Sequence, residues 1–151
     1  MIKTKRLSIY PTSDEQMKHM IDEETMPELK AAYQEMLDGC LAHPNDRVWY
    51  AIWNLELNDE SGLIVGNLSF KGICDGIVEI GYGTYPKYEG QGFMTEAVTA
   101  VVRWAANQPC VNRIEAEAEG DNVASIRVLQ KAGFIPTGEV GNEGPRFVFS
   151  C

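Results

Sequence analysis

EIGYGTYPKYEGQGFMTEA, residues 79–97, has the pattern of a strand, a short loop with two glycines and the start of a helix. Gly90 and Gly92 carry no Cβ, so backbone N–H groups at these positions can approach a bound anion closely. The helix that follows adds the positive end of its dipole. The pattern predicts a phosphate-binding loop, although a glycine turn that only redirects the chain has the same pattern.

Three strands are expected before this loop. Asp75-Gly76 is a strong hairpin signal between strands at 63–73 and 77–84. Residues 48–57 alternate in polarity, which is typical of a strand with one buried face. An antiparallel meander follows from this order. Trp49 and Trp53 would share one face of its first strand, where they serve either as core or as lining of a substrate cleft.

The remaining elements alternate between helix and strand. A short strand is predicted at 2–10, helices up to Glu24 and over 27–41, and a helix from Gly90 that ends at Asn107-Gln108-Pro109. A strand at 112–118, a helix at 122–132 that Gly133 stops, and strands at 134–140 and 145–150 complete the chain. Residues 141–144 join the last two strands. The pattern predicts an α/β class with a mixed sheet, in a single domain over residues 1–151.

Composition excludes several classes of function. The net charge of -9, with no Lys/Arg run, argues against a nucleic-acid partner. No apolar run is long enough to span a membrane, and no signal peptide is recognised, so a cytoplasmic protein is expected. The four cysteines, at positions 40, 74, 110 and 151, form no C-x-x-C pair, and only two histidines are present. We therefore expect free thiols and no metal site.

A second stretch, DNVASIRVLQKAGF at 121–134, makes a resemblance specific. The chain resembles the GNAT superfamily of N-acetyltransferases, and is most similar to the branch that includes ribosomal-protein N-terminal acetyltransferases. The matching residues of the first motif are Pro86, Gly90, Gly92, Thr95, Glu96 and Ala97. Those of the second are Asn122, Ser125, Leu129, Lys131, Gly133 and Phe134. Lys87 departs from the motif, because it stands where Gln or Arg is usual and lacks the planar fork of Arg.

The resemblance implies a mostly antiparallel central sheet with flanking helices, in which two parallel strands splay apart around acetyl-CoA. The pyrophosphate would lie on the 87–95 loop, and the pantetheine arm would pair with the backbone of residues 82–84. The implied cofactor-binding residues are Tyr82, Gly83, Thr84, Lys87, Gly90, Gln91, Gly92, Phe93, Met94, Thr95 and Asn122. Asn122 would also cap its helix. A monomer or a homodimer would fit this fold.

The implied reaction is direct attack of a primary amine on the thioester. Ser125 resembles the general acid of this branch, and a backbone N–H near Tyr82 would stabilise the oxyanion. We expect Glu79 to be the base, acting directly or through water, because its strand faces the expected reaction site. Glu117 and Glu56 are weaker candidates. The acceptor, a small-molecule or peptide amine, is not identified by any motif.

Two alternatives are kept. A strand, a G-x-G and a helix, followed by Glu115 and Glu117 on the next strand, imitate a dinucleotide-binding unit of an oxidoreductase. The spacing to Gly90 and the short chain argue against it. A CoA-binding regulatory protein without catalysis is the other alternative, and acetyl transfer would distinguish it from an enzyme.

Overall fold

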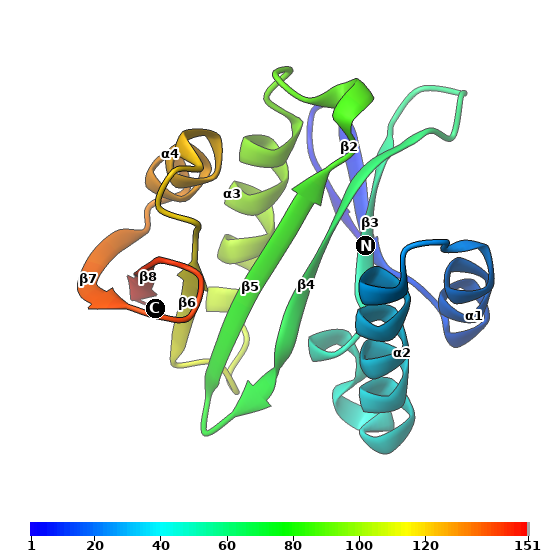
Figure 1. Ribbon diagram of the computed structural model, residues 1–151, viewed down its shortest axis with the longest axis horizontal. Coiled ribbons are helices and arrows are strands. Elements are labelled where there is room, and N and C mark those ends of the chain that lie inside the picture. The colour runs from blue at the N-terminus through cyan, green and yellow to red at the C-terminus, as the bar shows by residue number, and fades with distance from the viewer. Residues whose placement is uncertain (151) are drawn as a thin grey trace.

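A sheet of eight strands, in the order β1-β2-β3-β4-β5-β6-β8-β7, forms the centre of the computed structural model, which describes residues 1–150 (Figure 1). The strands are β1 (Ile2–Lys3), β2 (Leu7–Pro11), β3 (Ile52–Leu57), β4 (Ile64–Cys74), β5 (Ile77–Thr84), β6 (Arg113–Glu117), β7 (Ile135–Val140) and β8 (Pro145–Ser150). The helices are α1 (Asp14–Glu23), α2 (Pro27–Ala42), α3 (Phe93–Ala106) and α4 (Val123–Ala132). The predicted α/β class and mixed sheet are confirmed.

Helices cover both faces of this sheet. Ile52 packs with α1 and α2 in one apolar cluster, whereas its neighbour Trp53 packs with α3 in another. Because successive strand residues point to opposite faces, the α1–α2 pair and α3 lie on opposite sides. In Figure 1 the α1–α2 pair lies to the right of β5, and α3 lies behind that strand. None of the helices within residues 1–150 has both the length and the apolar character that crossing a membrane requires.

The neighbouring strands β5 and β6 run parallel, whereas the other strand pairs of the sheet are antiparallel. Their register extends from Ile77–Arg113 to Ile80–Ala116 and ends there. Residues 82–84 of β5 still pair with β4 on the other side. The two parallel strands therefore separate after four residue pairs, which leaves one edge of the last residues of β5 without a strand partner in the described part of the chain.

Turn residues fix the hairpin that leads into β5. Asp75 and Gly76 both have positive φ, at 52° and 79°. Two central residues with positive φ are typical of the type I′ turn, whose twist matches that of the flanking strands. The predicted hairpin is confirmed, and β5 has the predicted bounds of 77–84.

The strand predicted at 48–57 begins later than expected. Residues Pro44–Trp49 form a 3₁₀ helix, and β3 starts at Ile52. Trp53 holds this helix against the strand by donating from Nε1 to the carbonyl oxygen of Val48 at 2.9 Å. Trp49 reaches the core from the helix rather than from a strand, and its ring packs 4.9 Å from that of Phe70. Both tryptophans are at most 3% exposed, so they are core residues and do not line a cleft.

Candidate functional site

A pocket of about 810 Å³ opens where β5 separates from β6, between the end of β5, the glycine loop and α4. Ten of the residues predicted from the sequence line it: Tyr82, Gly83, Thr84, Gly90, Gly92, Phe93, Met94, Thr95, Asn122 and Ser125. Six further residues complete the lining: Tyr88, Glu89, Ala124, Arg127, Val128 and Lys131. The two motifs, which are about 30 residues apart in the sequence, thus form opposite walls of one cavity.

The glycine loop needs glycine at two positions. Gly90 and Gly92 have φ of 77° and 80°, a conformation that side chains with a Cβ rarely adopt. Gly92 is the residue before the first turn of α3 and carries no capping side chain. The backbone N–H groups of this first turn are therefore free of a side-chain cap, which is the arrangement that binds phosphate at a helix N-terminus.

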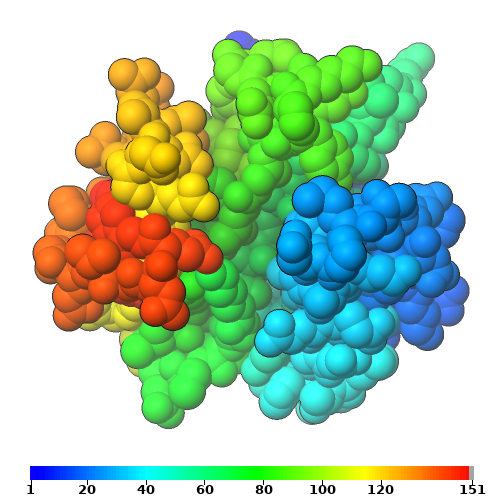
Figure 2. Space-filling model, in the orientation of Figure 1, coloured from blue at the N-terminus to red at the C-terminus, as the bar shows by residue number. Residues whose placement is uncertain are grey.

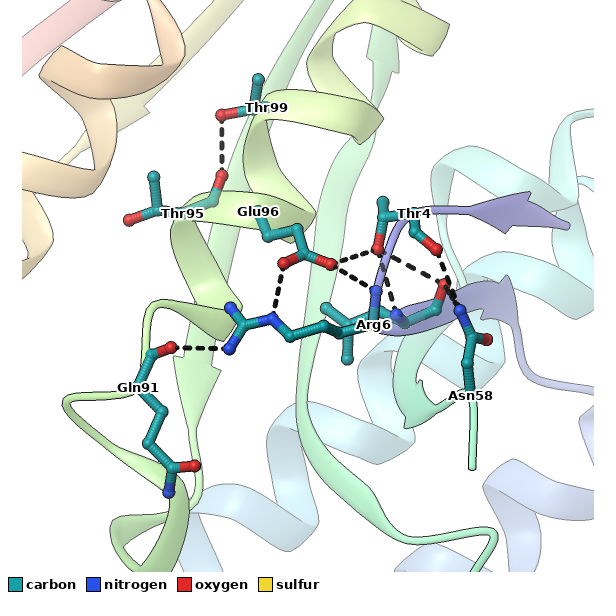
Figure 3. A network of polar contacts seen from close by, with 8 residues as sticks. Thr4, Arg6, Asn58, Gln91, Thr95, Glu96 and Thr99 are labelled. Carbon is teal, nitrogen blue, oxygen red and sulfur yellow. Dashed lines mark hydrogen bonds and ion pairs between the residues drawn. The ribbon is translucent and has the colours of Figure 1, made fainter. Parts of the chain in front are cut away.

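The N-terminal segment braces this loop (Figure 3). Arg6 donates from Nε to Glu96 in the first turn of α3 at 2.8 Å, and from Nη1 to the carbonyl oxygen of Gln91 at 2.9 Å. Its guanidinium also lies 4.4 Å from the ring centre of Phe93. Burial raises the pKa of Glu96, but its hydrogen bonds from Thr4 and Arg6 outweigh this and lower the pKa below the usual range. Glu96, a residue of the first motif, therefore helps to fix the glycine loop through its contacts with Arg6.

Two predicted cofactor residues do not line the pocket. Lys87 places its ammonium group 5.8 Å from the ring centre of Tyr88. Gln91 contributes its carbonyl oxygen to Arg6, and its side chain is exposed and points away from α3 in Figure 3. The cations that do line the pocket are Arg127 and Lys131, four residues apart on α4. Their i, i+4 spacing in the second motif was the signal that could have identified them.

Tyr82 connects the two walls of the pocket. Its hydroxyl lies 3.0 Å from both the carbonyl oxygen and the Oγ of Ser125. A phenol has one proton, so when it donates to the carbonyl the Ser125 hydroxyl donates to the phenol oxygen. Burial raises the pKa of Tyr82, and the contact with Ser125 opposes this only in part. Asn122 orients the same turn, because its Oδ1 accepts from the N–H of Ser125 at 3.0 Å.

Glu79 points to the other face of the sheet. Val78 and Ile80 pack in the core beside α3, so Glu79 lies between them on the α1–α2 side. One carboxylate oxygen contacts the ammonium of Lys71 at 2.7 Å, and the other contacts Arg146 at 2.6 Å. Burial raises the pKa of Glu79, but the hydrogen bonds and charges of these two cations outweigh it and lower the pKa below the usual range. The carboxylate is therefore ionised at neutral pH and is a weak base.

Arg146 is the centre of a charge network across three strands. Its guanidinium reaches Glu79 on β5 and both Glu115 and Glu117 on β6, at 2.6, 2.9 and 2.9 Å. These contacts raise the pKa of Arg146 far above its usual value. Glu117 also accepts the backbone N–H of Glu143 at 2.9 Å, which fixes the turn at 141–144. Sequence reasoning missed Arg146, because no motif surrounds it.

The two weaker base candidates are occupied elsewhere. Glu117 is the least exposed member of the Arg146 network, at 8% of its side chain. Glu56 lies on β3 and accepts a hydrogen bond from Tyr10 at 2.9 Å. Within residues 1–150 no group of three or more Cys, His, Asp or Glu side chains is arranged to hold a metal ion. Cys151, the last of the four cysteines, lies outside the described residues.

Comparison with known proteins points to one family. A family model described as an acetyltransferase (GNAT) domain matches residues 6–135. The chain is similar to YjdG of Bacillus subtilis, described as an uncharacterized N-acetyltransferase, with 39% identity over 74 residues. That match spans 48% of this chain and 44% of YjdG, so the chain accounts for less than half the length of this relative.

Solved structures extend the likeness to nearly the whole chain. RimL, a ribosomal alpha-N-protein acetyltransferase solved with coenzyme A, superposes with a TM-score of 0.74 at 16% identity, over 97% of this chain and 95% of RimL. A variant of the spermidine N-acetyltransferase SpeG from Vibrio cholerae gives a TM-score of 0.72 at 13% identity, over 97% and 95%. At such identities the likeness shows a shared fold.

Proposed function

Because the chain belongs to the acetyltransferase (GNAT) domain family, we propose that it transfers an acetyl group from acetyl-CoA to a primary amine. The observation that carries the proposal is the pocket between β5 and α4. A glycine loop, a helix N-terminus and two cationic side chains all line this one cavity. Its volume of about 810 Å³ lies within the usual range for cofactor sites.

The pyrophosphate end of the cofactor fits the glycine loop. Gly90 and Gly92 keep the loop free of side chains, and the N-terminus of α3 supplies uncapped N–H donors. We propose that Arg127 and Lys131, both on α4, contact the phosphates. They would replace the phosphate contact that was expected of Lys87, which does not line the pocket. Arg6 acts indirectly, by holding the loop through Gln91 and Glu96.

The pantetheine arm fits the separation of the parallel strands. Residues 82–84 of β5 line the pocket beyond the last pair with β6, so their free edge can pair with an extended amide chain. Acetyl-CoA supplies the activated acetyl group as a thioester. The backbone N–H near Tyr82 is our candidate for stabilising the oxyanion that forms from it.

Ser125 is proposed to protonate the leaving thiolate, with Tyr82 as its partner. Thiols titrate at about 8.5, so the thiolate already leaves well and the acid has a small contribution to make. The Tyr82 phenol lies 3.0 Å from the Ser125 oxygen and can donate a hydrogen bond to it as the serine gives up its proton, which solvent then restores. Asn122 holds the helix turn that presents the serine.

Glu79 is proposed to receive the proton of the attacking amine, directly or through a water molecule. Its lowered pKa keeps it ionised, so the proton passes on readily to solvent. Glu79 lies on the face of β5 opposite to Tyr82, which separates the proton acceptor from the thiolate side. This separation agrees with an acceptor that approaches from the α1–α2 face.

The acceptor is proposed to be a primary amine of a small molecule or a peptide. RimL is described as acting on a ribosomal protein N-terminus and SpeG on spermidine, so the shared fold accommodates both classes. We further propose a cytoplasmic location, as a monomer or a homodimer. The exposed free thiols of Cys74 and Cys110 are compatible with a reducing compartment.

The test is calorimetric titration with acetyl-CoA, with NADH as the control ligand, followed by thiol release against a panel of amines. Binding of acetyl-CoA without binding of NADH, together with thiol release by one amine, would support the proposal. Binding without thiol release by any amine would favour the regulatory alternative. A folded protein that does not bind acetyl-CoA would contradict both.

A further inference from the structure

A second hollow lies on the α1–α2 face of the sheet. Figure 2 shows it between the blue to cyan α1–α2 pair and the red C-terminal strands, with the green β4 and β5 as its floor. A pocket of about 520 Å³ on this floor is lined by the ring of Tyr50, by Lys71 and by the carboxylates Glu79 and Glu115. It holds charged groups of both signs beside an aromatic ring, which suits an amphiphilic ligand.

The two cations on Glu79 differ in how firmly they are held. Arg146 contacts three carboxylates and its side chain is 22% exposed. Lys71 forms its ion pair with Glu79, and its side chain is 50% exposed. An ion pair with a half-exposed lysine contributes little to stability, so another ammonium group can replace Lys71 at small cost.

Lys71 also lies against the backbone of β5, just before Tyr82. A Cβ built on Gly81 would come 3.5 Å from Cε of Lys71, so the lysine chain runs across the bare backbone of Gly81. The next residue is Tyr82, which lines the cofactor pocket on the opposite face. The ammonium of Lys71 is therefore a primary alkyl ammonium, bound to a carboxylate, one residue away from the proposed acetyl site.

We propose that Lys71 is an internal surrogate for the acceptor, which occupies Glu79 until the ammonium group of the substrate displaces it. The inference rests on the proposed function and names the substrate class, a primary alkyl ammonium whose chain lies against Tyr50. Glu79 then binds the incoming cation before it receives the proton. Lys71 is a specificity-determining residue in this scheme. Any acceptor that displaces Lys71 breaks its ion pair with Glu79, and only a cationic acceptor forms a new ion pair with that carboxylate.

The experiment compares Lys71→Met with Lys71→Arg. Methionine keeps the length of the chain over Gly81 and removes the charge, whereas arginine keeps the cation. The probe is n-butylammonium, titrated calorimetrically into protein with and without CoA, which carries no acetyl group and permits no reaction. We expect Lys71→Met to bind the probe about two- to fivefold more tightly than the unaltered protein, as loss of a surface ion pair allows. Lys71→Arg should bind as the unaltered protein does.

Lys18→Met is the matched control, because Lys18 is an exposed lysine on α1. It should leave the affinity for the probe unchanged. Weaker or equal binding by Lys71→Met, or no binding of the probe to any variant, would overturn the inference. The KM for an amine that the protein acetylates should fall by the same factor in Lys71→Met, with the KM for acetyl-CoA unchanged. Absence of acetyl transfer in all variants would instead contradict the proposed function, while the calorimetric result would still decide the role of Lys71.

Discussion

The proposed cofactor side and the proposed acceptor side of the sheet are built in different ways. The proposed cofactor pocket takes its walls from two continuous motifs, and much of the chemistry proposed for it uses backbone groups at Gly90, Gly92 and residues 82–84. The acceptor side depends on side-chain charges from β4, β5, β6 and β8, joined by Arg146. Backbone sites follow from local sequence, whereas a charge network depends on how distant strands are brought together.

The strongest test of this difference is Arg146→Met. The change leaves Glu79, Glu115 and Glu117 close together without their common cation. We expect a loss of about 3 kcal/mol of stability, the lower end of the range for breaking a buried ion pair, because these carboxylates are partly exposed. Urea denaturation measures it.

Arg113→Met is the control for that prediction. Among the described residues 1–150, Arg113 pairs with Glu115, and its side chain is 49% exposed. Its removal should cost less than about 1 kcal/mol. Equal losses of unfolding free energy in the two variants would show that the ion pairs of Arg146 are ordinary surface pairs. The acceptor side would then not depend on Arg146.

Gly92→Val should affect the cofactor side alone. A β-branched residue at a φ of 80° is strained by about 2 kcal/mol, and the loop relaxes by leaving the phosphate-binding conformation. Acetyl-CoA affinity should fall about 30-fold, as calorimetry would show. Gly62→Val is the matched control, since Gly62 also has positive φ, at 65°, and nothing lies near its missing Cβ. It should lose stability without losing affinity; an equal loss of affinity would contradict the special role of the loop.

Ser125→Ala separates chemistry from binding on the cofactor side. If Ser125 is the acid, kcat should fall about tenfold, or about 1.4 kcal/mol, because a thiolate needs little help to leave. Acetyl-CoA affinity should stay within about twofold. Tyr82→Phe is the companion variant, which keeps the ring and removes the partner of Ser125. Unchanged kcat in both variants would remove the pair from the mechanism.

The smallest effect is a pH dependence on the acceptor side. The pKa of Glu79 is lower in the folded protein than in the unfolded chain, where a glutamate titrates at about 4.3. Its ion pairs therefore stabilise the fold above that value, and the stabilisation is lost as the pH falls through the folded pKa. We expect Glu79→Gln to be less stable than the unaltered protein at pH 7, by about 1 kcal/mol or less, and the difference to vanish on acidification. A difference in melting temperature that is constant with pH would contradict this.

Local patterns were sufficient for much of the fold. Asp75-Gly76 fixed the bounds of β5, and Gly133, in the left-handed region at a φ of 102°, ends α4 as predicted. Both signals act within a few residues. The predicted start of β3 was wrong, because contacts between residues far apart in the sequence determine where this strand begins. Tyr50 follows the 3₁₀ helix, and its ring packs against Gly39 and Gly72. A Cβ on either glycine would come within 2.8 Å of this ring. The alternating pattern of residues 48–57 does not indicate these contacts.

The site shows the same limit. The sequence predicted ten residues of the pocket lining, because two motifs carry them. Arg146 was missed, since its partners on β5 and β6 lie 29 to 67 residues earlier in the chain. Glu79 was predicted from its strand position, but its two cationic partners, which lower its pKa, follow only from the folded arrangement.

The brace of Arg6 has a consequence for synthesis on the ribosome. Arg6 precedes Gln91 by 85 residues, so the anchor of the glycine loop has already left the ribosome when the loop itself emerges. Arg146 follows Glu79 by 67 residues, and the three carboxylates that it joins must wait for the last strand. The residues of the Arg6 brace are therefore all synthesised before Arg146, whereas Glu79, Glu115 and Glu117 lack their common cation until β8 is made.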